Sequence, residues 1–342
     1  MKITVIVSVA FTILAVTIAI LVSLSGPRTE PDAALPEPDE FAELPAPPSL
    51  EDLLPPKHIY PRADNDVILR VLLGDEIVEM TMERYLIGVV AAEMPASFEF
   101  HALKAQAVAA RTDALHKVYV SPKPQHPDAH VCGDFRCCVA FNSDETLQTR
   151  WGDDYVRHMT TIINAVIATD GVFMSYNGEP ILAVFHASSA GMTETSGNVW
   201  VSDRPYLQSV FSPETPELVP GFISTVTVTK ADFVETVQER YPNARFGEEP
   251  WITDIVRTES GRIFELTIGG VTTRGTSLRA MFGLRSTATD IEIIGDSIVF
   301  TTTGHGHGVG MSQYGAHIMA LKGKTYREIL SAYYTGIVFV EP

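Results

Sequence analysis

The feature that most limits this chain is a run of uncharged residues, 3–24, close to its N-terminus. An apolar helix of about 20 residues crosses the ~30 Å hydrocarbon core of a bilayer, whereas the core of a signal peptide has only ~7–15 residues. We therefore expect a transmembrane anchor over residues 1–25. A signal peptide cleaved near residues 23–25 is the alternative. With the anchor, the chain is a single-pass cell membrane protein, and its folded part is expected outside the cytoplasm.

The next segment, residues 26–60, is rich in proline and acidic residues, as in PEPDEFAELPAPPSLEDLLPP. Such a composition buries too little apolar surface to fold alone and favours extended conformations. We interpret it as a linker that holds the folded body, residues 61–342, away from the bilayer.

Composition argues against one broad class of function. The chain has 342 residues, with 25 Lys and Arg against 42 Asp and Glu, so its formal net charge is -17. Nucleic-acid-binding proteins gain most of their affinity from Lys and Arg that neutralise phosphates. We therefore expect no nucleic-acid partner.

The apolar pattern along the body predicts an α+β fold. Hairpin-linked strands mixed with helices favour this class over a doubly wound parallel sheet. A strand pair over 67–73 and 77–81 joined by Gly74 and Asp75 is followed by helices over 82–93 and 99–118, which Met94 and Pro95 separate. Short strands dominate residues 205–300, where we expect a second lobe. The remaining expected elements are helices at 154–169, 230–241, 276–282, 312–321 and 326–333, and strands at 172–176, 180–186, 222–229, 263–270, 291–295 and 297–303.

Glu93 is the strongest candidate for a catalytic group. It follows Leu86, Val89 and Val90 on one helical face and stands one residue before the expected break. Burial and the negative end of the helix dipole both disfavour a carboxylate there, which raises its pKa, and a general acid needs a raised pKa near neutral pH. A helix-terminal Glu that reaches solvent is the alternative.

Lys104 and Arg111 are seven positions apart and therefore share a face of the second expected helix. On that face they could hold a polar or anionic polymer near Glu93. The alternatives are a solvated helix flank for both, or a buried acid as the structural partner of Arg111.

Three cysteines lie close together in an expected loop over 121–149. His126, Cys132 and Cys138 form a ligand set that zinc favours in tetrahedral sites, and Cys137 and His130 could replace two of them. A disulfide between Cys132 and Cys138 is the alternative, which an oxidising cell surface permits.

Four segments together resemble the stage II sporulation protein D family. They are YLIGVVAAEMP at 85–95, ALKAQAVAART at 102–112, HASSAG at 186–191 and GHGVGMSQYGA at 306–316. The resemblance covers about residue 66 to the C-terminus. Members of the family that bind zinc carry a similar His, Cys and Cys arrangement, and CVAF at 138–141 resembles their motif except at Val139, where Gln is usual.

The resemblance implies a membrane-anchored lytic transglycosylase that cuts peptidoglycan during engulfment of the forespore. It implies Glu93 as the catalytic acid, a location in the mother-cell membrane facing the septal space, and collaboration with stage II sporulation proteins P and M. A single carboxylate suffices if it protonates the glycosidic oxygen and then takes the proton of the C6 hydroxyl that attacks C1 of the same sugar. The groove residues that the resemblance implies are His186, Ser188, Ser189, His307, Ser312, Gln313 and Tyr314.

Two other functional classes stay open. One is a non-catalytic, glycan-binding activator of a cell-wall amidase, because some relatives of the family are amidase enhancers. The other is a zinc hydrolase that uses His126, Cys132, Cys138 and a water. It is disfavoured because two thiolates make a weaker Lewis-acid centre than neutral nitrogen ligands.

Overall fold

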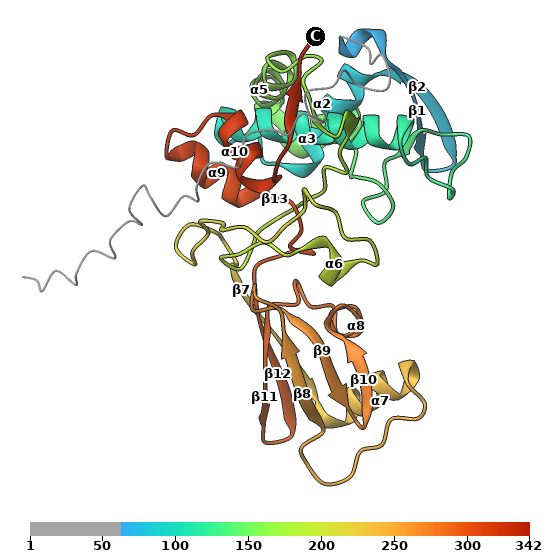
Figure 1. The fold of residues 1–342 in the computed structure, drawn as a ribbon, viewed down its shortest axis with the longest axis vertical. Helices are drawn as coiled ribbons and strands as arrows, with labels where there is room; N and C mark the ends of the chain where they lie inside the picture. The colour runs from blue at the N-terminus through green and yellow to red at the C-terminus, as the bar shows by residue number, and fades with distance from the viewer. Residues whose placement is uncertain (1–62) are drawn as a thin grey trace, which may run out of the picture. The chain divides into compact units, whose positions relative to one another are not determined.

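The computed structural model describes residues 63–342 (Figure 1). The expected anchor over 1–25 and the linker over 26–60 lie outside these residues. Between residues 63 and 342, no helix is both long enough and apolar enough to span a membrane.

The described part begins with a short 3-10 turn, η2 (Asp64–Asp66), and the predicted hairpin of β1 (Ile68–Leu73) and β2 (Glu76–Thr81). Gly74 turns between these strands with a φ of 63°, a conformation that glycine adopts without strain. Helix α2 (Met82–Glu93) follows directly, because the Thr81 side chain accepts the Arg84 N–H and caps its first turn. These predictions are confirmed.

Helix α3 (Phe100–Tyr119) is the centre of the hydrophobic core. Its many alanines let neighbouring helices approach closely, and it contacts α2, α5, α9 and α10. Figure 1 shows α3 passing behind and between these helices. The ends of α2 and α3 agree with the predicted break at Met94 and Pro95, where Met94 has an extended backbone.

The cysteine segment contains more regular structure than expected. Residues 121–149 include the short strand β3 (Val131–Cys132), parallel to β1, and most of α4 (Asp144–Trp151), which Ser143 caps. After η3 (Gly152–Asp154) come α5 (Tyr155–Ile167) and β4 (Phe173–Tyr176). The continuous strand predicted over 180–186 is wrong in its middle. Only β5 (Glu179–Pro180) and β6 (Phe185–His186) form. The backbone turns between them, because the Leu182 carbonyl accepts the Val184 N–H.

The residues between β6 and the C-terminal helices build two further three-stranded antiparallel sheets. Helix α6 (Ser196–Val199) precedes them, and α7 (Lys230–Arg240) and α8 (Gly275–Met281) accompany them. These sheets and helices have a hydrophobic cluster of their own, which includes Phe233, Phe282 and Phe300. The strands are β7 (Ile223–Thr229), β8 (Ile252–Arg257), β9 (Ile263–Ile268), β10 (Val271–Arg274), β11 (Thr289–Ile294) and β12 (Ser297–Thr303).

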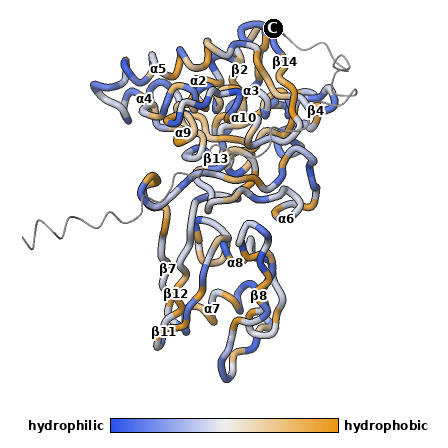
Figure 2. Tube along the Cα trace, turned by 60° about the vertical axis from the view of Figure 1, so that its left-hand side comes forward, coloured by the Kyte–Doolittle hydropathy of each residue, from blue (hydrophilic) through white to orange (hydrophobic). Residues whose placement is uncertain are grey.

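Exposure alternates along β7 and β12, as expected for strands with one covered face. In Figure 2 hydrophobic and pale, near-neutral residues follow one another along these strands. The chain then forms β13 (Met311–Ser312), α9 (Gln313–Leu321), α10 (Tyr326–Tyr333) and β14 (Val338–Val340), which pairs with β4. The described fold is α+β as predicted, with mostly antiparallel strand pairs and two parallel pairs of two residues each.

Candidate active site

Glu93 is the last residue of α2, and donors from two distant segments hold its carboxylate. The backbone N–H of Ala140 donates to Oε1, and the side-chain amide of Gln313 donates to Oε2, each at 3.0 Å. Ala140 lies just after the three cysteines, and Gln313 is the first residue of α9. The two donors fix the orientation of the carboxylate and stabilise it when it is ionised.

Burial raises the pKa of Glu93 above its ordinary value. The hydrogen bonds from Ala140 and Gln313 lower it by less, and the charge of Asp113 adds a smaller upward contribution. The predicted direction is therefore confirmed, with burial as the main cause. A carboxyl group that is protonated more readily than usual, yet has two donors ready for its anion, can both give and take a proton.

Aromatic side chains tie the chain after α2 to α9. The Phe98 ring stacks on His317 with centroids 4.3 Å apart and meets Tyr314 edge to face at 5.0 Å. The backbone N–H of Glu99 also donates to Nδ1 of His317 at 3.0 Å. Tyr314, expected in the groove, thus lies beside the loop that follows Glu93, whereas no sequence pattern identified Phe98 and His317.

A second buried acid holds two of the expected groove segments together. Glu214 accepts the backbone N–H of Ser189 at 2.7 Å and a very short hydrogen bond from the Ser312 hydroxyl. Ser312 also caps α9 and pairs with His186 between β13 and β6. Glu214 was not among the predicted residues, because no motif marks it. It holds the first turn of α9, from which Gln313 reaches Glu93.

The glycine-rich turn lies against the same segments. Ser188 forms an isolated bridge with His305, and Nδ1 of His307 accepts the Val309 N–H at 3.0 Å. Burial lowers the pKa of His307 to about 4, so its imidazole is neutral at physiological pH. Gly308 has a positive φ and lies so close to the Arg262 guanidinium that a Cβ would be 2.6 Å from its Nε.

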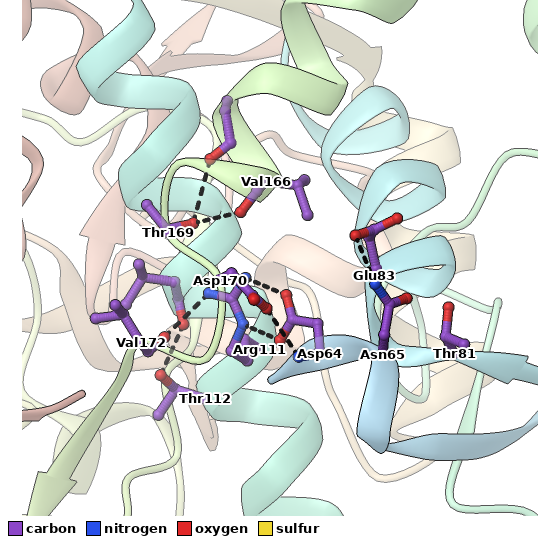
Figure 3. Close-up of polar contacts among 12 residues, drawn as sticks. Asp64, Asn65, Thr81, Glu83, Arg111, Thr112, Val166, Thr169, Asp170 and Val172 are labelled. Carbon is purple, nitrogen blue, oxygen red and sulfur yellow. Dashed lines mark hydrogen bonds and ion pairs between the residues drawn. The ribbon is translucent and has the colours of Figure 1, made fainter. Parts of the chain in front are cut away.

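Arg111 does not occupy the position expected for a substrate-binding residue. Its side chain is only 1% exposed, and its guanidinium donates twice to the Asp64 carboxylate at 2.6 Å and once to the Val172 carbonyl at 3.0 Å (Figure 3). Asp64 is itself buried, with 2% of its surface exposed. The expected contact of Arg111 with substrate is therefore corrected. Arg111 forms the structural ion pair with a buried acid that was the alternative.

Lys104 lies on α3, and its ammonium reaches α10. Its ammonium is 4.6 Å from the ring centroid of Tyr326 and 5.8 Å from that of Phe100, both typical cation–π distances. Burial, and then the nearby charge of Arg327, lower its pKa. A contact of Lys104 with substrate stays a prediction.

The predicted metal ligands converge, together with Cys137. The ligand atoms of His126, Cys132, Cys137 and Cys138 all lie within 4.8 Å of one another, and the three thiols are free. His130 is engaged elsewhere, since its Nδ1 accepts the Arg70 N–H at 3.2 Å. The three-residue set expected from the sequence thus becomes a four-residue set.

One distance within this group matches a tetrahedral zinc ion. Bonds of ~2.3 Å to sulfur and ~2.0 Å to nitrogen place neighbouring ligand atoms about 3.5–3.8 Å apart, and Sγ of Cys138 is 3.4 Å from Nε2 of His126. The other ring nitrogen of His126 lies 3.1 Å from the Ala129 carbonyl, a contact that leaves Nε2 free to bind a metal.

The segment directly after this cluster docks on α2. Phe141 stacks on Tyr85 with centroids 6.1 Å apart, and the Asn142 N–H donates to the Gly88 carbonyl. A Cβ at Gly88 would lie 2.2 Å from the Phe141 ring, so only glycine allows this approach. Ala140 lies between the cluster and Phe141, and the two contacts fix where its N–H meets Glu93.

Comparison with known proteins confirms the resemblance. Residues 74–176 match the family model described as "Stage II sporulation protein". The chain is 37% identical to stage II sporulation protein D of Bacillus subtilis (strain 168) over 263 residues, which are 77% of this chain and 75% of the relative. It is 35% identical to the protein of the same name from Bacillus amyloliquefaciens over 261 residues, 76% of this chain and 74% of the relative.

A more distant relative carries a different name. The chain is 28% identical to the amidase enhancer of Bacillus subtilis (strain 168) over 300 residues, 73% of this chain and 39% of that protein. On the strength of the two nearer relatives, the chain belongs to the stage II sporulation protein D family, a family of sporulation proteins.

Proposed function

We propose that this protein is a lytic transglycosylase that cuts peptidoglycan glycan strands between N-acetylmuramic acid and N-acetylglucosamine during engulfment of the forespore. The observation that carries the proposal is the carboxyl group of Glu93, whose pKa burial raises and whose two oxygens have donors at 3.0 Å. The family membership supports the cell-wall setting.

In this mechanism Glu93 acts twice. Its proton goes to the glycosidic oxygen while the bond from that oxygen to C1 of the muramoyl residue breaks, which frees the 4-hydroxyl of the next sugar. The carboxylate, now stabilised by Ala140 and Gln313, takes the proton of the C6 hydroxyl as that oxygen bonds to C1. The products are a 1,6-anhydro end and an ordinary hydroxyl end, and Glu93 regains its proton. The nucleophile belongs to the substrate, so one carboxyl group suffices.

We further propose zinc at His126, Cys132, Cys137 and Cys138. Bound zinc would supply a structural crosslink within the loop, because four protein ligands fill a tetrahedral shell and leave no position for a reactive water. The ordered loop would in turn fix the position of Ala140, which lies two positions after Cys138. The ligand set therefore disfavours a zinc hydrolase.

The second candidate is a glycan-binding activator of a cell-wall amidase. The 28% identity to a protein named amidase enhancer favours it. In either role, collaboration with stage II sporulation proteins P and M and a single-pass membrane location with the body outside the cytoplasm are part of the proposal.

Mass spectrometry of the products from purified glycan strands separates the candidates. A transglycosylase releases 1,6-anhydro ends from the strands without any other protein. Reducing ends formed with uptake of water indicate a hydrolase. An activator leaves the strands uncut and accelerates only a partner amidase. Absence of anhydro ends under conditions in which the strands bind would overturn the first proposal.

A further inference from the structure

Trp200, which no sequence pattern identified, lies in a row of aromatic rings with His307 and His186, two of the groove residues that the resemblance implies. The rings of Trp200 and His307 have centroids 5.2 Å apart at an interplanar angle of 54°, and those of His307 and His186 lie 5.7 Å apart at 53°. Trp200 is 37% exposed, whereas His186 is 4% exposed. The row therefore leads from the surface into the protein.

The outer ring is exposed, yet its backbone is firmly held. Trp200 caps the C-terminal end of α6, where its N–H donates to the Ser196 carbonyl at 2.8 Å. Arg274 donates to the Asn198 carbonyl at 2.7 Å, and the Asn198 side chain donates to Glu194 at 2.8 Å. A large aromatic side chain on a fixed backbone can bind a ligand without first losing much conformational freedom.

The inner ring presents an unused acceptor. Nδ1 of His186 lies 3.2 Å from the Val309 carbonyl and donates to it, so Nε2 of the neutral ring is an acceptor. That nitrogen is buried and has no hydrogen-bond partner among the described residues. A buried acceptor left unpaired is unfavourable, and a hydroxyl group or a water bound beneath a ligand would satisfy it.

The row also lies next to the segment that holds the candidate acid. His186 pairs with Ser312 in the short parallel contact of β6 and β13. The following residue, Gln313, donates to Glu93. One two-residue strand pair therefore connects the row with the segment that holds the carboxyl group.

We propose that Trp200, backed by His307, is a stacking subsite for an N-acetylhexosamine ring of the glycan strand. This subsite rests on the proposed function, because it names where a further sugar of that substrate binds. A sugar ring has an apolar C–H face that packs on an aromatic face, and hydroxyl groups at its edge that need polar partners. The exposed ring of Trp200 offers such an aromatic face. Burial keeps both imidazoles neutral at physiological pH, so Nε2 of His186 stays an acceptor.

The test measures binding by the full-length protein with Glu93→Gln, which traps the strand uncut. The probes are the hexamer of N-acetylglucosamine and purified glycan strands without stem peptides. In the Glu93→Gln protein, the further substitution Trp200→Ala should raise the dissociation constant for both probes at least tenfold. Trp200→Phe keeps an aromatic face and should raise that constant less than threefold. Val201→Ala is the matched control, because Val201 is the adjacent and fully exposed apolar residue.

A fluorescence measurement keeps the test independent of the stability of Trp200→Ala. With Trp151→Phe and Trp251→Phe, Trp200 is the sole tryptophan of the chain, and its emission should shift when the hexamer binds. Unchanged affinity in Trp200→Ala, or Trp200 emission that does not respond to the hexamer, overturns the subsite. If the parent protein still cuts glycan strands in that case, the proposed function stands. Equal losses in Val201→Ala and Trp200→Ala also overturn it, because they indicate a general apolar docking surface. Failure of the parent to bind or cut any strand removes the proposed function itself.

Discussion

The backbone N–H of Ala140 donates a 3.0 Å hydrogen bond to the carboxylate of Glu93, 47 positions earlier in the sequence. Ala140 directly follows the segment with the three cysteines, so the loop that gathers the proposed zinc ligands also orients the proposed catalytic acid. In the proposed mechanism, the loop would therefore position the catalytic acid, and a bound metal would take no part in the chemistry.

Replacing Glu93 by Gln should abolish glycan cleavage. The amide has nearly the shape of the carboxyl group but cannot supply the proton, and loss of general acid–base catalysis typically costs ~10²–10⁴-fold in rate. Strand binding should persist, because the proton is needed only for bond cleavage. Release of anhydro ends is the measurement, and a rate near that of the parent would rule out the mechanism.

The same substitution should change how stability depends on pH. The pKa of Glu93 is raised in the folded state, so the folded protein binds a proton more tightly than the unfolded chain does. Its contribution to stability is therefore present below the unfolded pKa of about 4.5 and is lost as pH rises through the folded pKa. Glu93→Gln should remove this loss, so its melting temperature relative to the parent should rise between pH 4 and pH 7. A difference that does not vary with pH would contradict the assignment.

Gln313→Ala should shift the pH profile of cleavage to higher pH. The Gln313 amide donates to the Glu93 carboxylate, and that hydrogen bond lowers the pKa of Glu93. Without it the carboxyl group keeps its proton to higher pH, and the anion that accepts the C6 proton is less stable. We expect a cleavage rate about tenfold lower, which corresponds to ~1.4 kcal/mol. Gln148→Ala, at an exposed position of α4, is the control and should leave both rate and profile unchanged.

Metal analysis of the purified protein should find about one zinc per chain. Because Cys137 lies among the ligand atoms, Cys137→Ser should lose zinc as readily as Cys132→Ser and Cys138→Ser, since thiolates dominate the affinity of such sites. His130→Ala is the control that should retain the metal. A protein without zinc in which peptide mapping finds a disulfide would refute the site.

Removal of zinc from the parent protein should also loosen the loop around Ala140. Hydrogen exchange at the amide of Ala140 should accelerate on chelation, because its protection depends on the contact with Glu93. Exchange in β12 should not change, since that strand belongs to the separate hydrophobic cluster. Equal exchange with and without metal would show that the cluster does not support the acid.

Local sequence patterns predicted much of this fold. They depend on residues close together in the chain, so they missed contacts between distant residues. The spacing of apolar residues defined α2 and α3, and the Met94 and Pro95 break placed Glu93 at a helix end, because these features depend on neighbours within one or two turns. The partners of Glu93 could not be found this way: Gln313 is 220 positions away. Gln313 entered through the family motif, and Glu214, which has no motif, was missed.

Arg111 shows the same limit and supplies the last prediction. Helical spacing with Lys104 indicated a shared face, but spacing does not say whether that face is covered. Its partner Asp64 comes from a turn before the first strand, 47 positions earlier. Sequence alone could not reveal that pairing.

Arg111→Ala should destabilise the protein strongly and leave glycan affinity intact. The substitution strands the Asp64 carboxylate, 2% exposed, without its partner, and breaking a buried pair in this way costs ~3–5 kcal/mol. Arg111→Lys should recover little, because one ammonium cannot replace two parallel hydrogen bonds. Arg157→Ala is the matched control: its pair with Asp154 is exposed on both sides, so its loss should cost less than ~1 kcal/mol. Chemical denaturation and glycan binding below the melting transition provide the two readings. A weakened affinity in a protein of unchanged stability would return Arg111 to the substrate groove.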